Sequence, residues 1–402
     1  MKTILFVCYG SGHVRMVVPV AQAVVAAGLA RVKVLALTTA APVVRAAQLD
    51  LLRIKDFVRP GNSQDLAALE TGRRLMADMP SVADPDETAA YLGLSYAELA
   101  EDVGADAAAE RYARDGRQAF SPRRLLERVL REVAPDLVFA TNSPRAERAA
   151  IQAARTLNLP SICLVDLFCF DEISWIGQPS YADHICVLNE SVKAFVVAAG
   201  RDAAKVSATG NPSFDTLLDP VYRSAGAQLR RARGWTSQKV VLWPVQEEPA
   251  FHPINGTPGD ALLPAKALRE IANWVMAHTD TVLCVRTRIG GQKPLLPQHP
   301  RLVVTGQDIE LAVLLQAVDL VVTLNSTVGL EGYLTGLPVV QVLGSLYDDA
   351  VPLKRHGLAD EAVPVSGVAD ALTRGIAKDR RPVATDKESA CTRVLEVVKR
   401  FL

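Results

Sequence analysis

The feature that most constrains the fold is the first 40 residues, which alternate between apolar runs and a helical segment. Residues 3–8 are apolar and β-rich, residues 9–12 read Tyr-Gly-Ser-Gly, and residues 15–27 are rich in Ala, Val and Gln. A second apolar run at 32–37 follows Gly28. A strand, helix and strand joined in this way form a right-handed crossover between parallel strands. The chain therefore begins as a βαβ unit.

The same alternation recurs in both halves of the chain, and each predicted strand ends at a polar loop. Residues 62–133 interrupt it, because they are rich in Ala, Arg, Glu and Asp with almost no β-branched runs, and they predict a helical insertion. Further strands are predicted at 137–140, 161–166, 184–188, 240–243, 281–286, 302–304, 320–324 and 338–342. Further helices are predicted at 146–157, 190–199, 226–235, 265–278, 309–317 and 328–335.

The length of the chain predicts two domains. At 402 residues it exceeds what one ordinary core supports. We expect a first α/β domain over 1–212, carrying the insertion, and a second over 213–385, with ligands bound in a cleft between them. Residues 386–402 are amphipathic and predict a C-terminal helix able to pack back on the first domain.

The charge balance excludes a general nucleic-acid binder. The chain has 44 Lys and Arg against 44 Asp and Glu, so an anionic ligand must be held by local groups. The six cysteines are scattered and predict reduced packing residues. No signal peptide or membrane span is evident, so we expect a cytoplasmic location. The arginine-rich stretches 123–131 and 230–233 leave a peripheral contact with the inner face of the membrane open.

The first candidate site is the turn formed by Gly10, Ser11, Gly12 and His13. Glycines there let the backbone approach a ligand, and the start of the helix offers unpaired N–H groups to an oxyanion. Arg15 stands where a dinucleotide-binding turn has its third glycine, so we expect no nicotinamide cofactor. Histidine side chains can take up and release a proton near neutral pH, so His13 is a candidate catalytic group. The alternative is a histidine that packs locally.

The second candidate site is the predicted strand, turn and helix over residues 324–332. Ser326, Thr327 and the first helical amides form a candidate phosphate cradle, with Asn325 and Gly329 beside it. Glu331 lies one turn further on, where a carboxylate can accept hydrogen bonds from both hydroxyls of a ribose. The alternative is a plain helix cap.

Charged residues near two other strand ends complete the candidate set. Arg286 and Arg288 follow a second-domain strand, where guanidinium groups can pair with a diphosphate. Asp166 ends a first-domain strand and is a candidate base toward an acceptor, with Asp171 and Glu172 in the same loop. Surface cations and solvated loop acids are the alternatives.

These motifs together resemble the GT-B nucleotide-sugar enzymes. The stretch NSTVGLEGYLTGLPVV, from Asn325, is similar to the nucleotide motif of bacterial capsule and lipopolysaccharide glycosyltransferases and of UDP-N-acetylglucosamine 2-epimerases. The stretch VSATGNPSFDTLLD, residues 206–219, resembles their interdomain segment, and the glycine turn with His13 resembles their first-domain turn. The resemblance implies two Rossmann-like doubly wound domains facing a cleft. Residues 60–135 show no such likeness.

The resemblance also implies roles and a function. It suggests a metal-independent glycosyltransferase without a cofactor, moving a sugar from a UDP- or CMP-type donor to a saccharide or lipid-linked acceptor in cell-surface polysaccharide synthesis. His13 would be the base or the donor-phosphate contact, Asp166 a catalytic partner, and Asn211 a residue bordering the cleft. The residues expected to bind the donor are Gly10, Ser11, Gly12, Asn211, Arg286, Arg288, Asn325, Ser326, Thr327, Gly329 and Glu331.

Three other functions remain open. The run GSGHVRM, from Gly10, resembles UDP-sugar hydrolases of pseudaminic acid synthesis. A non-hydrolysing 2-epimerase has the same fold, but residues 164–168 and 242–248 stand where those enzymes carry acidic and His-Arg-rich loops. A non-catalytic nucleotide-sugar binding protein would keep Glu331 and the phosphate turn without depending on His13.

Overall fold

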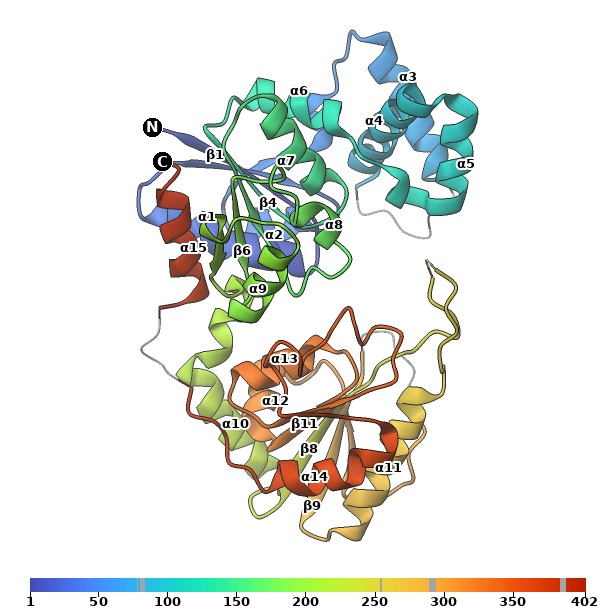
Figure 1. The fold of residues 1–402 in the computed structure, drawn as a ribbon, viewed down its shortest axis with the longest axis vertical. Helices are drawn as coiled ribbons and strands as arrows, with labels where there is room; N and C mark the ends of the chain where they lie inside the picture. The colour runs from blue at the N-terminus through green and yellow to red at the C-terminus, as the bar shows by residue number, and fades with distance from the viewer. Residues whose placement is uncertain (78, 80–83, 254, 289–293, 384–387) are drawn as a thin grey trace. The chain divides into compact units, whose positions relative to one another are not determined.

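The computed structural model describes residues 1–77, 79, 84–253, 255–288, 294–383 and 388–402. These residues form two compact units, each built on its own parallel sheet (Figure 1). Unit 1 contains residues 1–213 and 388–402, and unit 2 contains residues 214–387. The first predicted boundary, after residue 212, differs by one residue from this division. The second, at residue 385, falls outside the described residues.

Unit 1 is a seven-stranded parallel sheet covered by helices on both faces. Its strands are β1 Thr3–Cys8, β2 Arg31–Ala36, β3 Asp50–Leu52, β4 Leu137–Thr141, β5 Ser161–Leu164, β6 His184–Val187 and β7 Val206–Ala208. Its covering helices include α1 Gly12–Ala26, α2 Ala40–Ala46, α7 Ala146–Thr156, α8 Ile173–Ile176 and α9 Glu190–Ala198. Strands β1 and β4 are buried almost end to end, which explains why they read as apolar runs rather than alternating patterns.

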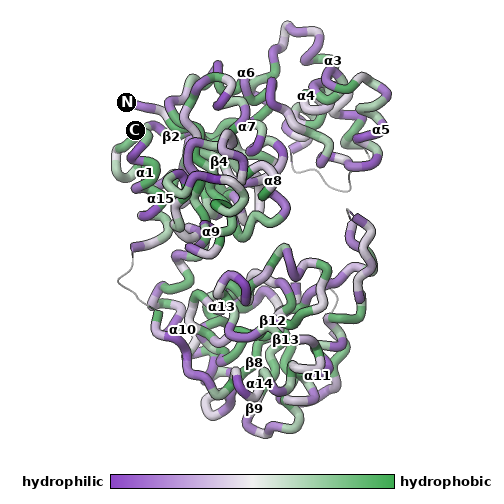
Figure 2. The backbone as a smooth tube through the Cα atoms, viewed as in Figure 1, coloured by the Kyte–Doolittle hydropathy of each residue, from purple (hydrophilic) through white to green (hydrophobic). Residues whose placement is uncertain are grey.

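The core of unit 1 forms where these two strands meet. The rings of Phe6 on β1 and Phe139 on β4 lie 4.8 Å apart between centroids. Valines and alanines of α1 cover them, among them Val17 and Val20. Figure 2 shows the hydrophobic residues gathered on the strands and the hydrophilic ones toward the outside.

The connection from β3 to β4 is helical and contains η1 Ile54–Phe57, α3 Ser63–Leu75, α4 Pro85–Val103, α5 Ala105–Asp115 and α6 Arg123–Val133. Helices α3 and α4 pack in backbone contact. A Cβ added to Gly72 would lie 1.9 Å from the carbonyl oxygen of Ala89, and one added to Gly93 would lie 1.9 Å from that of Ala68. Glycine is therefore required at both positions. Helix α6 packs against α7 of the sheet layer.

The segment that follows unit 2 returns to unit 1. Helix α15 (Ala390–Lys399) packs beside α1 and buries Val394, Val397 and Val398 in the same core as β1 and β2. The Arg393 side chain donates a hydrogen bond from Nε to the Thr209 carbonyl at 2.7 Å. The C-terminal helix is thus part of unit 1.

Unit 2 is a six-stranded parallel sheet with helices on both faces. Its strands are β8 Lys239–Pro244, β9 Thr281–Arg286, β10 Leu302–Thr305, β11 Leu320–Thr323, β12 Val339–Val342 and β13 Glu361–Val363. Its helices are α10 Pro220–Ala232, α11 Leu263–Ala277, α12 Leu311–Ala317, α13 Thr327–Leu334 and α14 Val368–Ile376, with η4 Pro212–Leu218 leading in from unit 1. Trp243 of β8 is the largest fully buried side chain of the core.

Both sheets follow the same doubly wound order. Unit 1 runs β3-β2-β1-β4-β5-β6-β7, and unit 2 runs β10-β9-β8-β11-β12-β13. In each, the chain crosses from one half of the sheet to the other between two central strands, β1 and β4 or β8 and β11. Loops that leave the carboxyl ends of such a pair diverge, and open α/β sheets bind ligands there. The order predicts one binding edge for each unit.

The arginine-rich stretches proposed as a membrane contact are largely used within the fold. Arg124 pairs with Asp102 at 2.7 Å and Arg128 with Asp65 at 2.6 Å. Arg230 pairs with Asp319 at 2.8 Å. Among the described residues, no helix is both long and apolar enough to cross a bilayer. Five of the six cysteines are buried in the described structure, in agreement with the prediction that they are packing residues: Cys8, Cys163, Cys169, Cys186 and Cys284.

Candidate functional site

The turn between β1 and α1 places the first motif at the switch point of unit 1. Ser11 has φ 59° and ψ −127°, a combination that residues with a side chain rarely adopt and that concentrates at functional sites. A Cβ on Gly10 would lie 1.9 Å from Thr39 Oγ1, so that glycine is explained by the neighbouring loop rather than by a ligand. A Cβ on Gly12 would meet nothing within 4 Å. The open side of the turn is therefore at Gly12.

His13 is held by the neighbouring strand. Its Nδ1 lies 2.8 Å from Thr141 Oγ1, at the end of β4, and the Thr141 hydroxyl donates to Glu147 Oε1 at 3.5 Å. With Nδ1 donating to the hydroxyl, Nε2 is the nitrogen left to accept a proton. Nε2 lies 3.9 Å from Asp166 Oδ2, and about a fifth of the His13 side chain is exposed. The contact at Nδ1 fixes the orientation of the ring, and Nε2 remains accessible.

Glu147 is the buried end of this chain of contacts. It lies in the first turn of α7 and is fully buried. Burial raises the pKa of its carboxyl, and the nearby charge of His13 acts in the opposite direction. A proton gained by His13 therefore favours an ionised Glu147. Through Thr141, the two groups form a coupled pair.

Asp166 is fixed by amides from two other loops. Its Oδ1 accepts a hydrogen bond from Asn142 Nδ2 at 3.0 Å, and its backbone N–H donates to Asn142 Oδ1 at 3.0 Å. Asn211 Nδ2 donates to the Asp166 carbonyl oxygen at 2.8 Å, while Asn211 Oδ1 accepts from Ser213. Asn211 thus supports the loop that carries Asp166, and its own amide is occupied. Asp166 Oδ2 faces His13.

A second acid lies close to Asp166. Glu172, at the N-terminus of α8, has its pKa raised from 4.5 to about 7, first by burial and then by the charges of Asp166 and Asp171. A carboxyl that titrates near neutrality can give or take a proton at physiological pH. The carboxyl edge of unit 1 therefore holds a histidine and three acids, Glu147, Asp166 and Glu172.

The second motif forms the turn between β11 and α13, at the switch point of unit 2. Ser326 is the N-cap of α13, and its hydroxyl accepts from Val328 N at 3.2 Å. Thr327 begins the helix and is exposed. A Cβ on Gly329 would lie 2.6 Å from Thr323 Cγ2, so this glycine allows α13 to pack closely on β11. Gly329 has a packing role that the sequence does not reveal.

Asn325 belongs to a hydrogen-bonded network under this turn. Its Oδ1 accepts from Gln246 Nε2 at 2.6 Å, and its Nδ2 donates to Ser345 Oγ at 2.8 Å. Gln246 Oε1 accepts from Leu324 N and from the hydroxyl of Thr323. Ser345 donates in turn to Glu248 Oε2 at 2.7 Å. The network joins the loops after β8, β11 and β12 and makes the turn rigid.

A cavity of about 310 Å³ lies beside this turn, lined by Gln246, Arg286, Arg288, Asn325 and Ser326 among others. Arg286 Nη1 donates to the carbonyl oxygens of Gly306 and Ile309, so much of its donor capacity is used inside unit 2. Burial lowers the pKa of Arg286, and Glu331 is one of the charges that oppose the shift. Arg288 is exposed and lies 3.8 Å from Glu247.

The structure thus brings the predicted residues together as two groups. Gly10, Ser11, Gly12, His13, Asp166 and Asn211 gather at the carboxyl edge of unit 1, and Arg286, Arg288, Asn325, Ser326, Thr327, Gly329 and Glu331 gather at that of unit 2. Of the described residues, Thr327, Gly329 and Glu331 are not among those that line the 310 Å³ cavity. Sequence reasoning missed Thr141, Asn142 and Glu147. The one available signal was the polar end of the strand at 137–140.

The comparisons with known proteins agree with this architecture. The family model described as "Capsule polysaccharide biosynthesis protein" matches residues 271–361, which contain β9 to β12 and end at the first residue of β13. No curated protein matches the chain by sequence.

Solved structures match over the whole length at low identity. S. aureus MnaA, solved with UDP, is 13% identical with a TM-score of 0.59, and the match covers 100% of this chain and 97% of that one. The UDP-GlcNAc 2-epimerase from Neisseria meningitidis, bound to UDP-GlcNAc, is 12% identical with a TM-score of 0.56 and coverages of 99% and 100%. The glycotransferase of kitacinnamycin is 16% identical with a TM-score of 0.54 and coverages of 100% and 99%. At such identity these likenesses concern the fold. The prediction from the motifs is confirmed: the chain has the GT-B fold, shared with UDP-GlcNAc 2-epimerases and glycosyltransferases.

Proposed function

We propose that the protein is a glycosyltransferase that uses a nucleotide-sugar donor and a saccharide or lipid-linked acceptor in cell-surface polysaccharide synthesis. The observation that carries the proposal is the setting of His13, whose Nδ1 is held by Thr141 and whose Nε2 lies open beside Asp166. The family match to capsule polysaccharide biosynthesis supports the pathway. The UDP and UDP-GlcNAc bound by the solved neighbours support the class of donor.

In this proposal His13 is the general base. Nε2 takes the proton from an acceptor hydroxyl as the oxygen attacks the anomeric carbon of the donor sugar, and the bond to the leaving phosphate breaks. The imidazolium that forms is stabilised by Asp166 beside Nε2 and by Thr141 and Glu147 on the side of Nδ1. Asn142 and Asn211 hold Asp166 and its loop in position.

In the same proposal, unit 2 binds the nucleotide. The start of α13 and the hydroxyls of Ser326 and Thr327 offer donors to the diphosphate, and Arg288 adds an exposed cation. Glu331 is the proposed ribose ligand. Arg286 acts by holding the loop at 306–309 in place. The site as proposed neutralises the leaving group with a helix dipole and arginine, so it requires no metal.

The test is a turnover screen with UDP-, GDP-, CMP- and dTDP-sugars, with and without saccharide acceptors, measuring nucleotide release and the product sugar. The variant is His13→Asn, whose amide can still donate to Thr141 but cannot act as a base. The matched control is His278→Asn, because His278 is exposed and precedes β9 at the opposite edge of the unit 2 sheet. We expect release that requires an acceptor, is lost in His13→Asn and persists in the control.

Other outcomes assign the alternatives. Free sugar released without an acceptor would indicate a UDP-sugar hydrolase. A C2 epimer of the donor would indicate an epimerase. Binding without turnover, unaffected by His13→Asn, would indicate a nucleotide-sugar binding protein and would refute catalysis by His13.

A further inference from the structure

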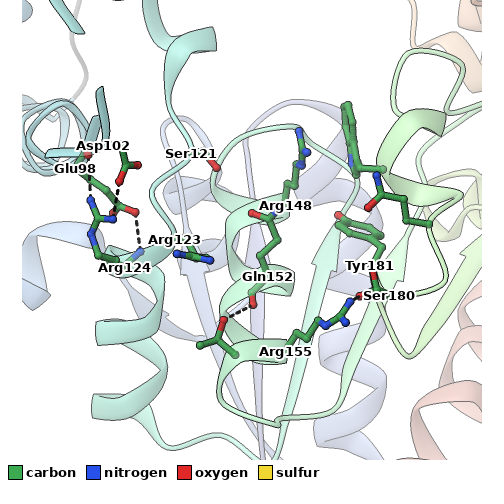
Figure 3. Close-up of a pocket in the computed structure, with 13 residues that line it drawn as sticks. Glu98, Asp102, Ser121, Arg123, Arg124, Arg148, Gln152, Arg155, Ser180 and Tyr181 are labelled. Atoms are coloured by element: carbon green, nitrogen blue, oxygen red, sulfur yellow. Dashed lines mark hydrogen bonds and ion pairs between the residues drawn. The ribbon is translucent and has the colours of Figure 1, made fainter. Parts of the chain in front are cut away.

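Unit 1 contains a second cavity whose lining is rich in arginine. It has a volume of about 480 Å³ and lies between the helical region at α4 and α6 and the sheet-covering helices α7 and α8 (Figure 3). Its volume is within the range of small-molecule sites, but such sites are usually apolar and this lining is mainly charged and polar. A charged, hydrated ligand is therefore the kind that fits.

The lining has an excess of positive charge. Four arginines face two carboxylates, Glu98 and Asp102, and both carboxylates are already engaged. Glu98 accepts hydrogen bonds from the backbone N–H groups of Arg124 and Leu125 and so caps α6. Asp102 pairs with the Arg124 side chain at 2.7 Å, as the dashed lines in Figure 3 show. The unbalanced charge therefore lies on the α7 side.

Helix α7 presents this charge along one stripe. Arg148, Gln152 and Arg155 are spaced at i, i+4 and i+7, and Figure 3 shows them in succession along the helix. The Arg148 guanidinium carbon lies 4.4 Å from the centroid of the Trp175 ring, and Arg155 Nη1 donates to the Ser180 carbonyl at 2.5 Å. Within the described part of the chain, neither arginine has a carboxylate at ion-pairing distance.

These contacts orient the two guanidinium groups while leaving further N–H donors for a ligand. An Arg group held by an aromatic face or a carbonyl loses less conformational entropy on binding and still offers a paired set of donors to an oxyanion. Arg123, at the start of α6, adds a third cation, with Glu127 no nearer than 3.8 Å. The amides of Gln152 and Gln178 supply neutral donors and acceptors at the same cavity.

We propose that this cavity binds a saccharide that carries a carboxylate or a phosphate, with Arg148 and Arg155 on the oxyanion and the glutamine amides on the sugar hydroxyls. Oxyanion and hydroxyl groups on one small molecule match both kinds of lining group. The inference goes beyond the proposed function and does not depend on it, because it concerns a ligand other than the donor and is tested by binding alone.

The experiment is isothermal titration of the full chain with glucose 1-phosphate, glucuronate, inorganic phosphate and glucose. The variant is Arg148→Gln with Arg155→Gln. The matched control is Arg73→Gln with Arg74→Gln, which removes the same charge from the exposed face of α3. Trp175 is the only tryptophan in the sequence of unit 1, so its fluorescence gives a second readout, which Trp175→Phe removes. Thermal denaturation verifies that each variant is folded.

We expect at least one of the two charged sugars to bind to the wild type and to the control. The α7 variant should bind it at least about tenfold more weakly, since charge-assisted hydrogen bonds are lost. UDP binding should be the same in all three proteins. The inference is overturned if neither charged sugar binds at millimolar concentration, if the α7 variant binds as the wild type does, or if glucose binds equally well. Equal binding of inorganic phosphate would overturn the saccharide part, and a parallel loss of UDP binding would show that the cavity is not a separate site.

Discussion

Glu172 makes the stability of unit 1 depend on pH in the direction opposite to that of most carboxylates. Its pKa is raised from 4.5 to about 7 by burial and by Asp166 and Asp171. Between these two values the folded state holds a proton that the unfolded state has released, so the free energy of unfolding falls as the pH rises. The stabilisation is complete below about pH 4.5 and is lost above about pH 7.

The magnitude follows from the shift. A change of about 2.5 pKa units corresponds to about 3 kcal/mol, and we reduce this to about 2 kcal/mol because the side chain is partly exposed. The glutamine side chain in Glu172→Gln is neutral at every pH, so the folded variant has no buried carboxyl to ionise. We expect it to match the wild type at about pH 4 and to exceed its free energy of unfolding by about 2 kcal/mol at about pH 8.

Urea denaturation of both proteins at several pH values between these limits measures the difference. Glu110→Gln is the control, because Glu110 is exposed on α5 and lies apart from these acids in the fold. The reasoning is refuted if the stability curves of Glu172→Gln and the wild type run parallel across this range. It is also refuted if the difference between the two proteins is present at about pH 4 and absent at about pH 8.

Three further predictions concern packing and the histidine site. Gly329→Ala should lower the free energy of unfolding by about 1–3 kcal/mol, because the new Cβ would lie 2.6 Å from Thr323 Cγ2. Gly12→Ala has open space around the new Cβ and should leave the free energy of unfolding unchanged. Urea denaturation compares the two variants, and equal effects would contradict the packing argument. Thr141→Val keeps the shape of the side chain but removes the hydroxyl between His13 and Glu147. It should lower the rate of nucleotide release on the order of 100-fold, and Thr141→Ser should restore that rate. Full activity of the valine variant would exclude the hydroxyl from the mechanism. Val398→Ala on α15 should lower the free energy of unfolding by about 2 kcal/mol, because Val398 is buried in the core of unit 1. Urea denaturation measures this change, and an unchanged midpoint would mean that α15 does not stabilise the core.

Much of the fold could be predicted from the sequence because long buried strands carry a strong local signal. The strand at 281–286 coincides with β9, and the first strand with β1. The segments that were missed are short. Strands β3, β7 and β13 have three residues each and pair at the edges of their sheets. An edge strand of this length has too few apolar residues to stand out.

The candidate site was harder to predict because it is assembled by strand order. His13 follows β1 and Thr141 ends β4. These strands pair directly, although β2, β3 and the six helices α1 to α6 separate them in the described sequence. No local pattern reveals that pairing. Glu147 sits in the run Ala-Glu-Arg-Ala, which has the composition of an exposed helix, yet the residue is fully buried. Its role depends on tertiary contacts alone.

The return of α15 to unit 1 has a consequence for how the chain folds during synthesis. The core that contains Val394, Val397 and Val398 also contains β1 and α1, so one hydrophobic layer is built from the first and the last residues of the sequence. The ribosome must therefore make the whole of unit 2 before unit 1 can close its core, and until then the face of α1 that α15 covers is exposed to solvent and to chaperones. In topological terms unit 2 is an insertion within unit 1, although it is the unit free to fold first.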